Sequence, residues 1–162
     1  GSGLTSLDLS STQVTTIGQG AFANTTSLTT LKVPSTLATI NSANSDNNRT
    51  FQGSGITELD LSNTKITSIA NSTFSGAASL ATVKLPAAVT SIGNQAFQGS
   101  GISTINLEAT QVTTIGQGAF ANTTNLATLK CQAHWQLWIV QILTLLIQVA
   151  SLPLSKAQGS LN

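Results

Sequence analysis

Charged, sulfur-containing and aromatic side chains are scarce in this chain of 162 residues. Charged residues make up 7% of it and aromatic residues 4%, and it contains no Met and no Tyr. Six Lys and Arg residues are balanced by five Asp and Glu residues, scattered singly, for a net charge of +1. Because no basic patch is available to follow a phosphate backbone, we expect no nucleic-acid partner.

Cysteine and histidine occur once each, as Cys131 and His134. A disulfide framework or a cysteine-based metal site needs at least two cysteines, so neither is expected. No third group accompanies this pair to orient the histidine as a catalytic base. The repeats that make up most of the chain contain no GxxxxGK[S/T] phosphate loop and no carboxylate pair at metal-ligand spacing. We therefore predict no catalytic residue, no metal and no cofactor, in a protein that is not an enzyme.

Most of the chain is an internal repeat. Five units and the start of a sixth, spaced 22 to 28 residues apart, begin at Leu4, Leu28, Ile56, Leu80, Ile102 and Leu126. Each full unit has six apolar positions, which in the first unit are Leu4, Leu7, Leu9, Val14, Ile17 and Phe22. The LxL alternation predicts a short strand with one buried face. Because one unit cannot bury its own apolar residues, we expect the units to stack, Leu over Leu and Phe over Phe.

Residues 79–100, "SLATVKLPAAVTSIGNQAFQGS", closely resemble the BspA-type leucine-rich repeat, in which a strand ending in Pro is followed by SIG and AF. The resemblance extends over about residues 2–130. This chain departs from the family after the Phe, where Cys is common in the family; the residues here are Thr25, Ser54, Ala77, Ser100 and Thr123. Small or hydroxyl-bearing side chains can fill the same inward turn.

The resemblance implies a right-handed leucine-rich repeat solenoid, with a parallel β-sheet on one face and loops or short helical turns on the other. It also implies a non-catalytic binding or adhesion protein at the cell surface or in the extracellular space. We expect residues 1–130 to form this solenoid, as a fragment of a longer array, and residues 131–162 to form a separate apolar tail.

One outward residue lies between the last two apolar positions of each predicted strand, giving the series Asp8, Lys32, Asp60, Lys84, Asn106 and Lys130. Parallel strands lie about 4.8 Å apart, so these side chains should form a ladder of nearly alternating charge on the concave face. The ladder can simply avoid repulsion between like charges on adjacent strands. Alternatively, together with Glu58, Thr82 and Glu108 beside it, the ladder binds an extracellular protein or glycan. Both interpretations stay open.

Other polar features lie outside the predicted strands. The second unit alone carries an insertion, "NSANSDNNRT", between Ile40 and Phe51, and such loops can be tolerated or functional. Four N-x-S/T sequons are candidate glycosylation sites on the non-strand side, at Asn24, Asn48, Asn71 and Asn122.

Two further functions are compatible with the repeats. A solenoid without a ligand could act as a structural spacer in a surface or matrix. A flat array of hydroxyl groups could bind ice, and the regularly placed threonines that would form it are Thr15, Thr16, Thr90, Thr113 and Thr114.

The tail permits three interpretations. Residues 135–154 are uncharged and apolar enough for a membrane span of about 20 residues, but three Gln and Pro153 interrupt them, and Lys130 is the single positive residue near the N-terminal end of the segment. Membrane anchoring is therefore disfavoured. A helix that caps the solenoid is the second interpretation, although caps usually turn a polar face to water.

The third interpretation rests on a duplication: residues 12–32 and 110–130 are identical at 19 of 21 positions, but the sequences then diverge. When the tail is written as degenerate codons and read from the third base of each codon, it permits eleven of the thirteen residues from Pro34 to Asp46. Further on, the same frame permits QGSGITE, the sequence of residues 52–58. We therefore favour residues 131–162 as the frameshifted remnant of a sixth repeat.

Overall fold

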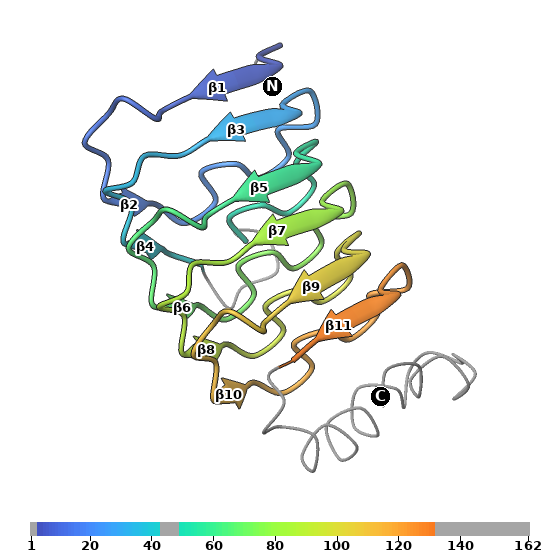
Figure 1. The fold of residues 1–162 in the computed structure, drawn as a ribbon. Helices are drawn as coiled ribbons and strands as arrows, with labels where there is room; N and C mark the ends of the chain where they lie inside the picture. The colour runs from blue at the N-terminus through green and yellow to red at the C-terminus, as the bar shows by residue number, and fades with distance from the viewer. Residues whose placement is uncertain (1–2, 43–48, 132–162) are drawn as a thin grey trace.

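The computed structural model describes residues 3–42 and 49–131. Over these residues the chain forms eleven short strands and no helix, wound into a stack of similar turns (Figure 1). Each turn brings one three-residue strand to one side of the stack. The predicted solenoid is therefore confirmed, with turns and very short strands in place of helical turns.

The three-residue strands form one parallel sheet that follows the order of the chain. They are β1 (Ser6–Asp8), β3 (Thr30–Lys32), β5 (Glu58–Asp60), β7 (Thr82–Lys84), β9 (Thr104–Asn106) and β11 (Thr128–Lys130). The middle residue of each is apolar and points into the stack, and the two flanking residues point outward. The strands predicted from the LxL alternation are confirmed.

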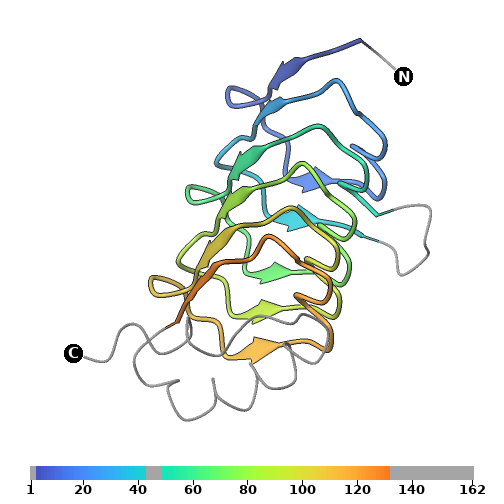
Figure 2. The same cartoon turned by 90° about the vertical axis from the view of Figure 1, so that its right-hand side faces the viewer.

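A second row of strands, which the sequence did not predict, lies on the other side of the stack (Figure 2). These two-residue strands are β2 (Thr16–Ile17), β4 (Thr39–Ile40), β6 (Ser68–Ile69), β8 (Ser91–Ile92) and β10 (Thr114–Ile115). Each consists of a hydroxyl residue that points outward and an Ile that points inward. β2 pairs with β4, and β6, β8 and β10 form a separate sheet. The insertion of the second unit comes after β4, where the two sheets are interrupted.

Stacked phenylalanine rings run through the core. Successive ring centroids are 5.0 to 5.4 Å apart, along the series Phe22, Phe51, Phe74, Phe97 and Phe120. The Leu, Ile and Val residues at the other apolar positions of the interior units are also buried, except for Val33 and Leu85, which are partly buried. The predicted stacking of each unit on the next is confirmed.

The glycine that follows the inner Ile is required by close approach between units. A Cβ atom on Gly116 would lie 2.4 Å from the backbone nitrogen of Asn94, and one on Gly93 would lie 2.6 Å from that of Asn71. A Cβ atom on Gly18, at the same position in the first unit, would have no neighbour within 4 Å. Close backbone approach therefore explains the glycine only where another unit precedes it.

The large sheet is built from pairs of units. β1–β3, β5–β7 and β9–β11 are each in register over three residues. By contrast, the register of β3–β5 covers only Thr30 and Glu58, and that of β7–β9 only Thr82 and Thr104. In both of these cases a Pro, Pro34 or Pro86, lies two residues after the first strand of the pair, where the other strands have Ser10, Ser62 and Glu108. In this sheet, adjacent pairs of units are thus joined less extensively than the two units within a pair, whereas the short strands β6, β8 and β10 pair equally from one unit to the next.

Candidate functional site

The outward side chains of the six-stranded sheet form two columns, which we call the strand face. The first column consists of the first residues of the strands, Ser6, Thr30, Glu58, Thr82, Thr104 and Thr128. The second consists of the third residues, Asp8, Lys32, Asp60, Lys84, Asn106 and Lys130. The register places the second column side by side within each pair of units, as an acid or Asn beside a Lys. The predicted ladder is confirmed as a structural feature, and its role in binding stays a prediction.

Ion pairs join the two strands of a pair. Lys32 Nζ lies 3.2 Å from Asp8 Oδ2. Lys84 Nζ lies 2.9 Å from Glu58 Oε1 and 3.4 Å from Asp60 Oδ2. All of these side chains are about half exposed, so the pairs contribute little to stability. Their main effect is to orient long side chains on the surface.

Serine residues hold the two aspartates in place. Asp8 Oδ1 accepts hydrogen bonds from the hydroxyl group and the backbone N–H of Ser10, at 2.6 and 2.9 Å. Ser62 donates the same two bonds to Asp60 at the same distances. The bonds from Ser10, aided by Lys32, lower the pKa of Asp8 to about 2. The pKa of Asp60 is lowered chiefly by the hydroxyl group of Ser62, so both carboxylates stay ionised at neutral pH.

Two other predicted residues, Lys84 and Glu108, differ from the aspartates in their surroundings. The pKa of Lys84 is raised because its ammonium group donates hydrogen bonds to Glu58, which has the larger effect, and to Asp60. Lys84 therefore stays protonated at neutral pH. Glu108 is exposed but lies in the turn after β9, where its backbone N–H donates to Asn106 Oδ1 at 2.9 Å. Glu108 therefore occupies the position of Ser10 and Ser62, beyond the end of the strand.

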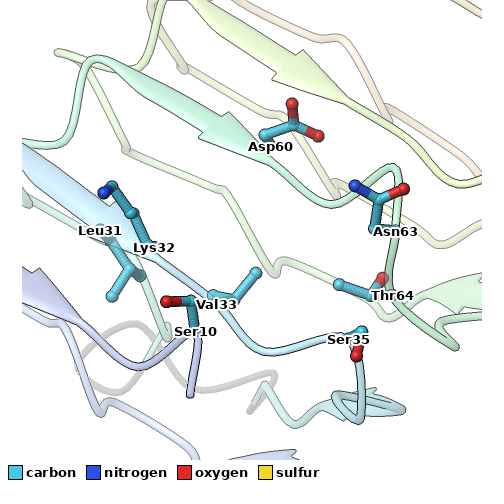
Figure 3. Close-up of a pocket in the computed structure, with 8 residues that line it drawn as sticks. All are labelled: Ser10, Leu31, Lys32, Val33, Ser35, Asp60, Asn63 and Thr64. Atoms are coloured by element: carbon cyan, nitrogen blue, oxygen red, sulfur yellow. The ribbon is translucent and has the colours of Figure 1, made fainter. Parts of the chain in front are cut away.

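A recess lies between β3 and β5, where only one residue pair joins the strands. Its volume is about 210 Å³, and it is lined by Ser10, Leu31, Lys32, Val33, Ser35, Asp60, Asn63 and Thr64 (Figure 3). Lys32 and Asp60 lie on its two sides, but their ion pairs are with Asp8 and Lys84, on the outer strands. The recess thus offers a cation and an anion that are not bonded to each other. Sequence reasoning missed it, although the Pro after β3 was a signal that the pairing ends there.

The candidate glycosylation sites lie outside the six-stranded sheet. Asn24, Asn71 and Asn122 are exposed, and each is in a turn. Asn71 Oδ1 accepts a hydrogen bond of 2.8 Å from the backbone N–H of Asn94. Asn48 lies outside the described residues. Modification of these residues stays a prediction.

The threonines of the predicted ice-binding array lie in and beside the short strands. Thr16 and Thr114 are the outward residues of β2 and β10. The hydroxyl group of Thr90 donates to the carbonyl oxygen of Thr67 at 3.1 Å, and that of Thr113 donates to Thr90 at 3.4 Å. At least these two hydroxyl groups therefore link one unit to the next.

The remaining predictions concern metal binding, the single Cys and His, and a membrane span. Among residues 3–42 and 49–131, no three His, Cys, Asp or Glu side chains gather where they could hold a metal ion. No helix in this part of the chain is long and apolar enough to cross a membrane. Cys131 is half-buried, and burial raises the pKa of its thiol. His134 and the possible span at 135–154 lie outside the described residues.

Comparisons with known proteins agree with this architecture. The chain is similar to a leucine-rich cell surface protein from Faecalibacterium prausnitzii, with 30% identity over 72% of this chain and a TM-score of 0.60. It is also similar to a leucine-rich repeat protein from Bacteroides ovatus, with 29% identity over 72% of this chain and a TM-score of 0.54. The chain spans 29% of each of those two proteins. A search of curated proteins found no match.

A family profile describes the repeats themselves. Residues 44–137 match the BspA type leucine rich repeat region (6 copies). The matched residues are more than half of the chain and include strands β5 to β11, the SIG segment at residues 91–93 and the stacked rings from Phe51 to Phe120. The chain therefore belongs to the BspA-type leucine-rich repeat family.

Proposed function

We propose that this chain is a non-catalytic binding module that acts at the cell surface or outside the cell and holds a glycan on its strand face. The observation that carries the proposal is the recess between β3 and β5, which opens on a surface of oriented polar side chains. The description of the Faecalibacterium relative as a cell surface protein supports the location.

The polarity of the strand face favours a glycan over a protein. Protein interfaces are enriched in Tyr, Trp, Phe, Met and Arg at their centres, and none of these residues lies in the two columns. Among the described residues, the exposed large hydrophobic side chain is Leu4, which precedes β1. A ligand made mainly of hydroxyl groups needs donors and acceptors instead. The recess provides both, because Lys32 donates, Asp60 accepts, and Asn63 can do either.

The ion pairs prepare the face for binding. Ordering a long side chain when a ligand binds lowers the affinity, and this loss is smaller when the side chain is already held in place. Lys32 is held by Asp8, and Asp60 is held by Ser62 and Lys84. Each retains hydrogen-bonding capacity for a ligand, since an ammonium group has three donors and a carboxylate about four acceptor sites.

The repetition of the face favours an extended ligand. Lysines recur on every second strand, as Lys32, Lys84 and Lys130, which corresponds to an interval of about 9.6 Å. A linear chain of several sugars would contact more than one pair of units at once. Linked contacts of this kind raise the overall affinity without any new type of contact.

Binding of the full chain to immobilised linear polysaccharides and to a mucin tests the proposal. We expect saturable binding to at least one polysaccharide at physiological ionic strength. Lys32→Glu should weaken it at least about tenfold, because the substitution places a second anion opposite Asp60. Lys65→Glu is the matched control, since Lys65 is exposed in the turn between β5 and β6, outside the strand face.

Circular dichroism should show that both variants keep the fold. Binding that is lost equally in both variants would contradict a site on the strand face. Binding to the polypeptide of the mucin after its glycans are removed would point to a protein ligand. If no probe binds saturably, the proposal is overturned and the alternative function, a structural spacer without a ligand, is favoured.

A further inference from the structure

The described part of the solenoid ends at β11 with apolar residues that are only partly buried. Within the described residues β11 pairs with β9 alone, and Leu126, Leu129 and Ile115 are only partly buried beside it. The equivalent residues of the first copy are buried: Leu28 is 2% exposed and Leu31 is 5% exposed. The two segments have almost the same sequence, so the difference arises from the residues that come after each segment in the chain.

In the first copy, the rest of the second unit covers Ile17 and Phe22, whereas Leu31 in β3 has β5 of the third unit as its next neighbour. Leu37 is 0% exposed, Ile40 is 5% exposed, and Phe51 is 1% exposed and stacks on Phe22 at 5.4 Å. Phe120, the equivalent of Phe22, has Phe97 as its stacking partner in the described part of the chain. Within residues 3–42 and 49–131, the β11 end therefore has no residues that correspond to Leu37, Ile40 and Phe51.

The sixth unit is correctly formed up to Lys130. The backbone N–H of Leu107 donates to the carbonyl oxygen of Lys130 at 2.8 Å, as Leu9 does to Lys32 at 2.9 Å. All three residues of β11 are in register with β9, as those of β3 are with β1. The match to the second unit ends at Cys131, which replaces Val33. The structural repeat thus continues up to Lys130, and the shifted reading frame begins at the next residue, Cys131.

The shifted frame supplies the missing core residues. Read from the third base of each codon, the junction of His134 and Trp135 can only encode Leu, at the position of Leu37. At the position of Ile40 the frame permits Met, Val or Leu, all of them apolar. Further on, after a connection six residues longer than that between Leu37 and Phe51, reading from the codon of Leu154 permits Phe immediately before QGSGITE, as Phe51 precedes the same sequence. The apolar pattern is therefore preserved at all three positions, including the one where the residue itself differs.

We infer that the β11 end is the docking surface for the second half of a sixth repeat, which is encoded one base out of frame after Lys130. That half would extend the row of short strands beyond β10, because the frame also permits the Thr of β4. It would add one ring to the phenylalanine stack. The inference is independent of the proposed ligand, because it concerns only contacts between units.

The coding DNA provides the first test, because the inference specifies third bases that the protein sequence leaves free. Encoding Pro34, Thr36 and Ser45 in the shifted frame requires TGC for Cys131, GCA for Ala133 and ATT for Ile142. We expect these codons, and sequencing of the gene reads them directly. Other third bases at most of these positions would overturn the inference, since the shifted frame would then not encode the repeat.

Hydrogen exchange provides the second test, at the level of the protein. It compares the chain as written, a chain that ends at Cys131, and a chimera in which a copy of residues 33–61 is joined after Lys130. We expect the amide protons of Leu129 and Ile115 to exchange at least about tenfold more slowly in the chimera than in the other two chains, because a docked unit must open before they exchange.

Two results of the exchange experiment would overturn the inference. If the chain as written protects Leu129 and Ile115 as strongly as the chimera does, its own tail covers the β11 end. If the chimera protects them no better than the shortened chain, the surface does not accept a repeat unit. Far-UV circular dichroism of all three chains establishes that units one to five remain folded in each.

Discussion

Residues 4–32 and 102–130 are equivalent segments at opposite ends of the solenoid, identical at 20 of 29 positions, and they differ in what they bury. Leu4 is 45% exposed, whereas its equivalent Ile102 is 0% exposed. At the C-terminal end of each copy the difference in exposure is reversed: Leu31 in the first copy is 5% exposed, whereas its equivalent Leu129 is only partly buried. Burial in this fold is thus set by the neighbouring units, as expected when each unit contacts only the next.

The largest expected effect comes from removing the same leucine in both copies. Leu31→Ala should lower the free energy of unfolding by about 2–5 kcal/mol, because it leaves a cavity between two units. Leu129→Ala should lower it by only about 1–2 kcal/mol, because less apolar surface is lost. Urea denaturation monitored by circular dichroism measures both. Equal losses would contradict the difference in environment between the two copies.

The second test adds an atom instead of removing atoms, by replacing the equivalent glycine with alanine in each copy. Gly116→Ala should lower the free energy of unfolding by about 1–3 kcal/mol, since the new Cβ would meet the backbone of Asn94 and force a shift. Gly18→Ala should be neutral or raise it by up to about 1 kcal/mol, because the site is open and alanine restricts the unfolded chain. Thermal unfolding of both variants is the measurement, and equal destabilisation would argue against close approach as the reason for the glycine.

The turn after each Phe offers a third, smaller contrast. In this turn Thr123 donates its hydroxyl proton to the carbonyl oxygen of Phe120 at 2.6 Å, whereas the buried hydroxyl group of Ser100 has no partner in the described structure. Ser100→Ala should therefore raise the free energy of unfolding by about 1 kcal/mol, and Thr123→Ala should lower it by about the same amount. Urea midpoints of the two variants report the signs, and a loss of stability in Ser100→Ala would indicate that its hydroxyl group is bonded.

The smallest effect concerns the one strand-face position at which the copies differ in charge, Asp8 and Asn106. The pKa of Asp8 is about 2 in the folded state, below the value of about 3.9 for an unfolded aspartate. Its contribution to stability is therefore fully present above about pH 4 and is lost as the pH falls through about 2. Carbon-detected NMR titration of the carboxyl group measures the pKa. Asp8→Asn should remove this contribution, and a folded-state pKa near 4 would show that Ser10 and Lys32 do not act on the carboxylate.

Much of the fold could be predicted from the sequence because its determinants are local. The LxL alternation predicted the strands of the large sheet, and the recurring Phe predicted the stacked core. The alternation of Asp and Lys predicted which charges lie side by side within a pair of units. What the sequence could not show was how far adjacent strands pair, and hence the recess beside Lys32 and Asp60. It also did not predict the short strands such as β8, which form only against another unit.

The sequence by itself determined the period, the inward and outward positions, and the need to stack, because an apolar face repeated every 22 to 28 residues must be covered. Its tail, written as degenerate codons, is also the basis of the inference that a repeat continues out of frame after Lys130. Only the tertiary structure decided that the strands of the large sheet pair most extensively two by two, that Gly116 touches its neighbour while Gly18 does not, and which of the described apolar residues are only partly buried. The physical reason is that these properties belong to contacts between units, and identical residues acquire different contacts at the two ends of a stack.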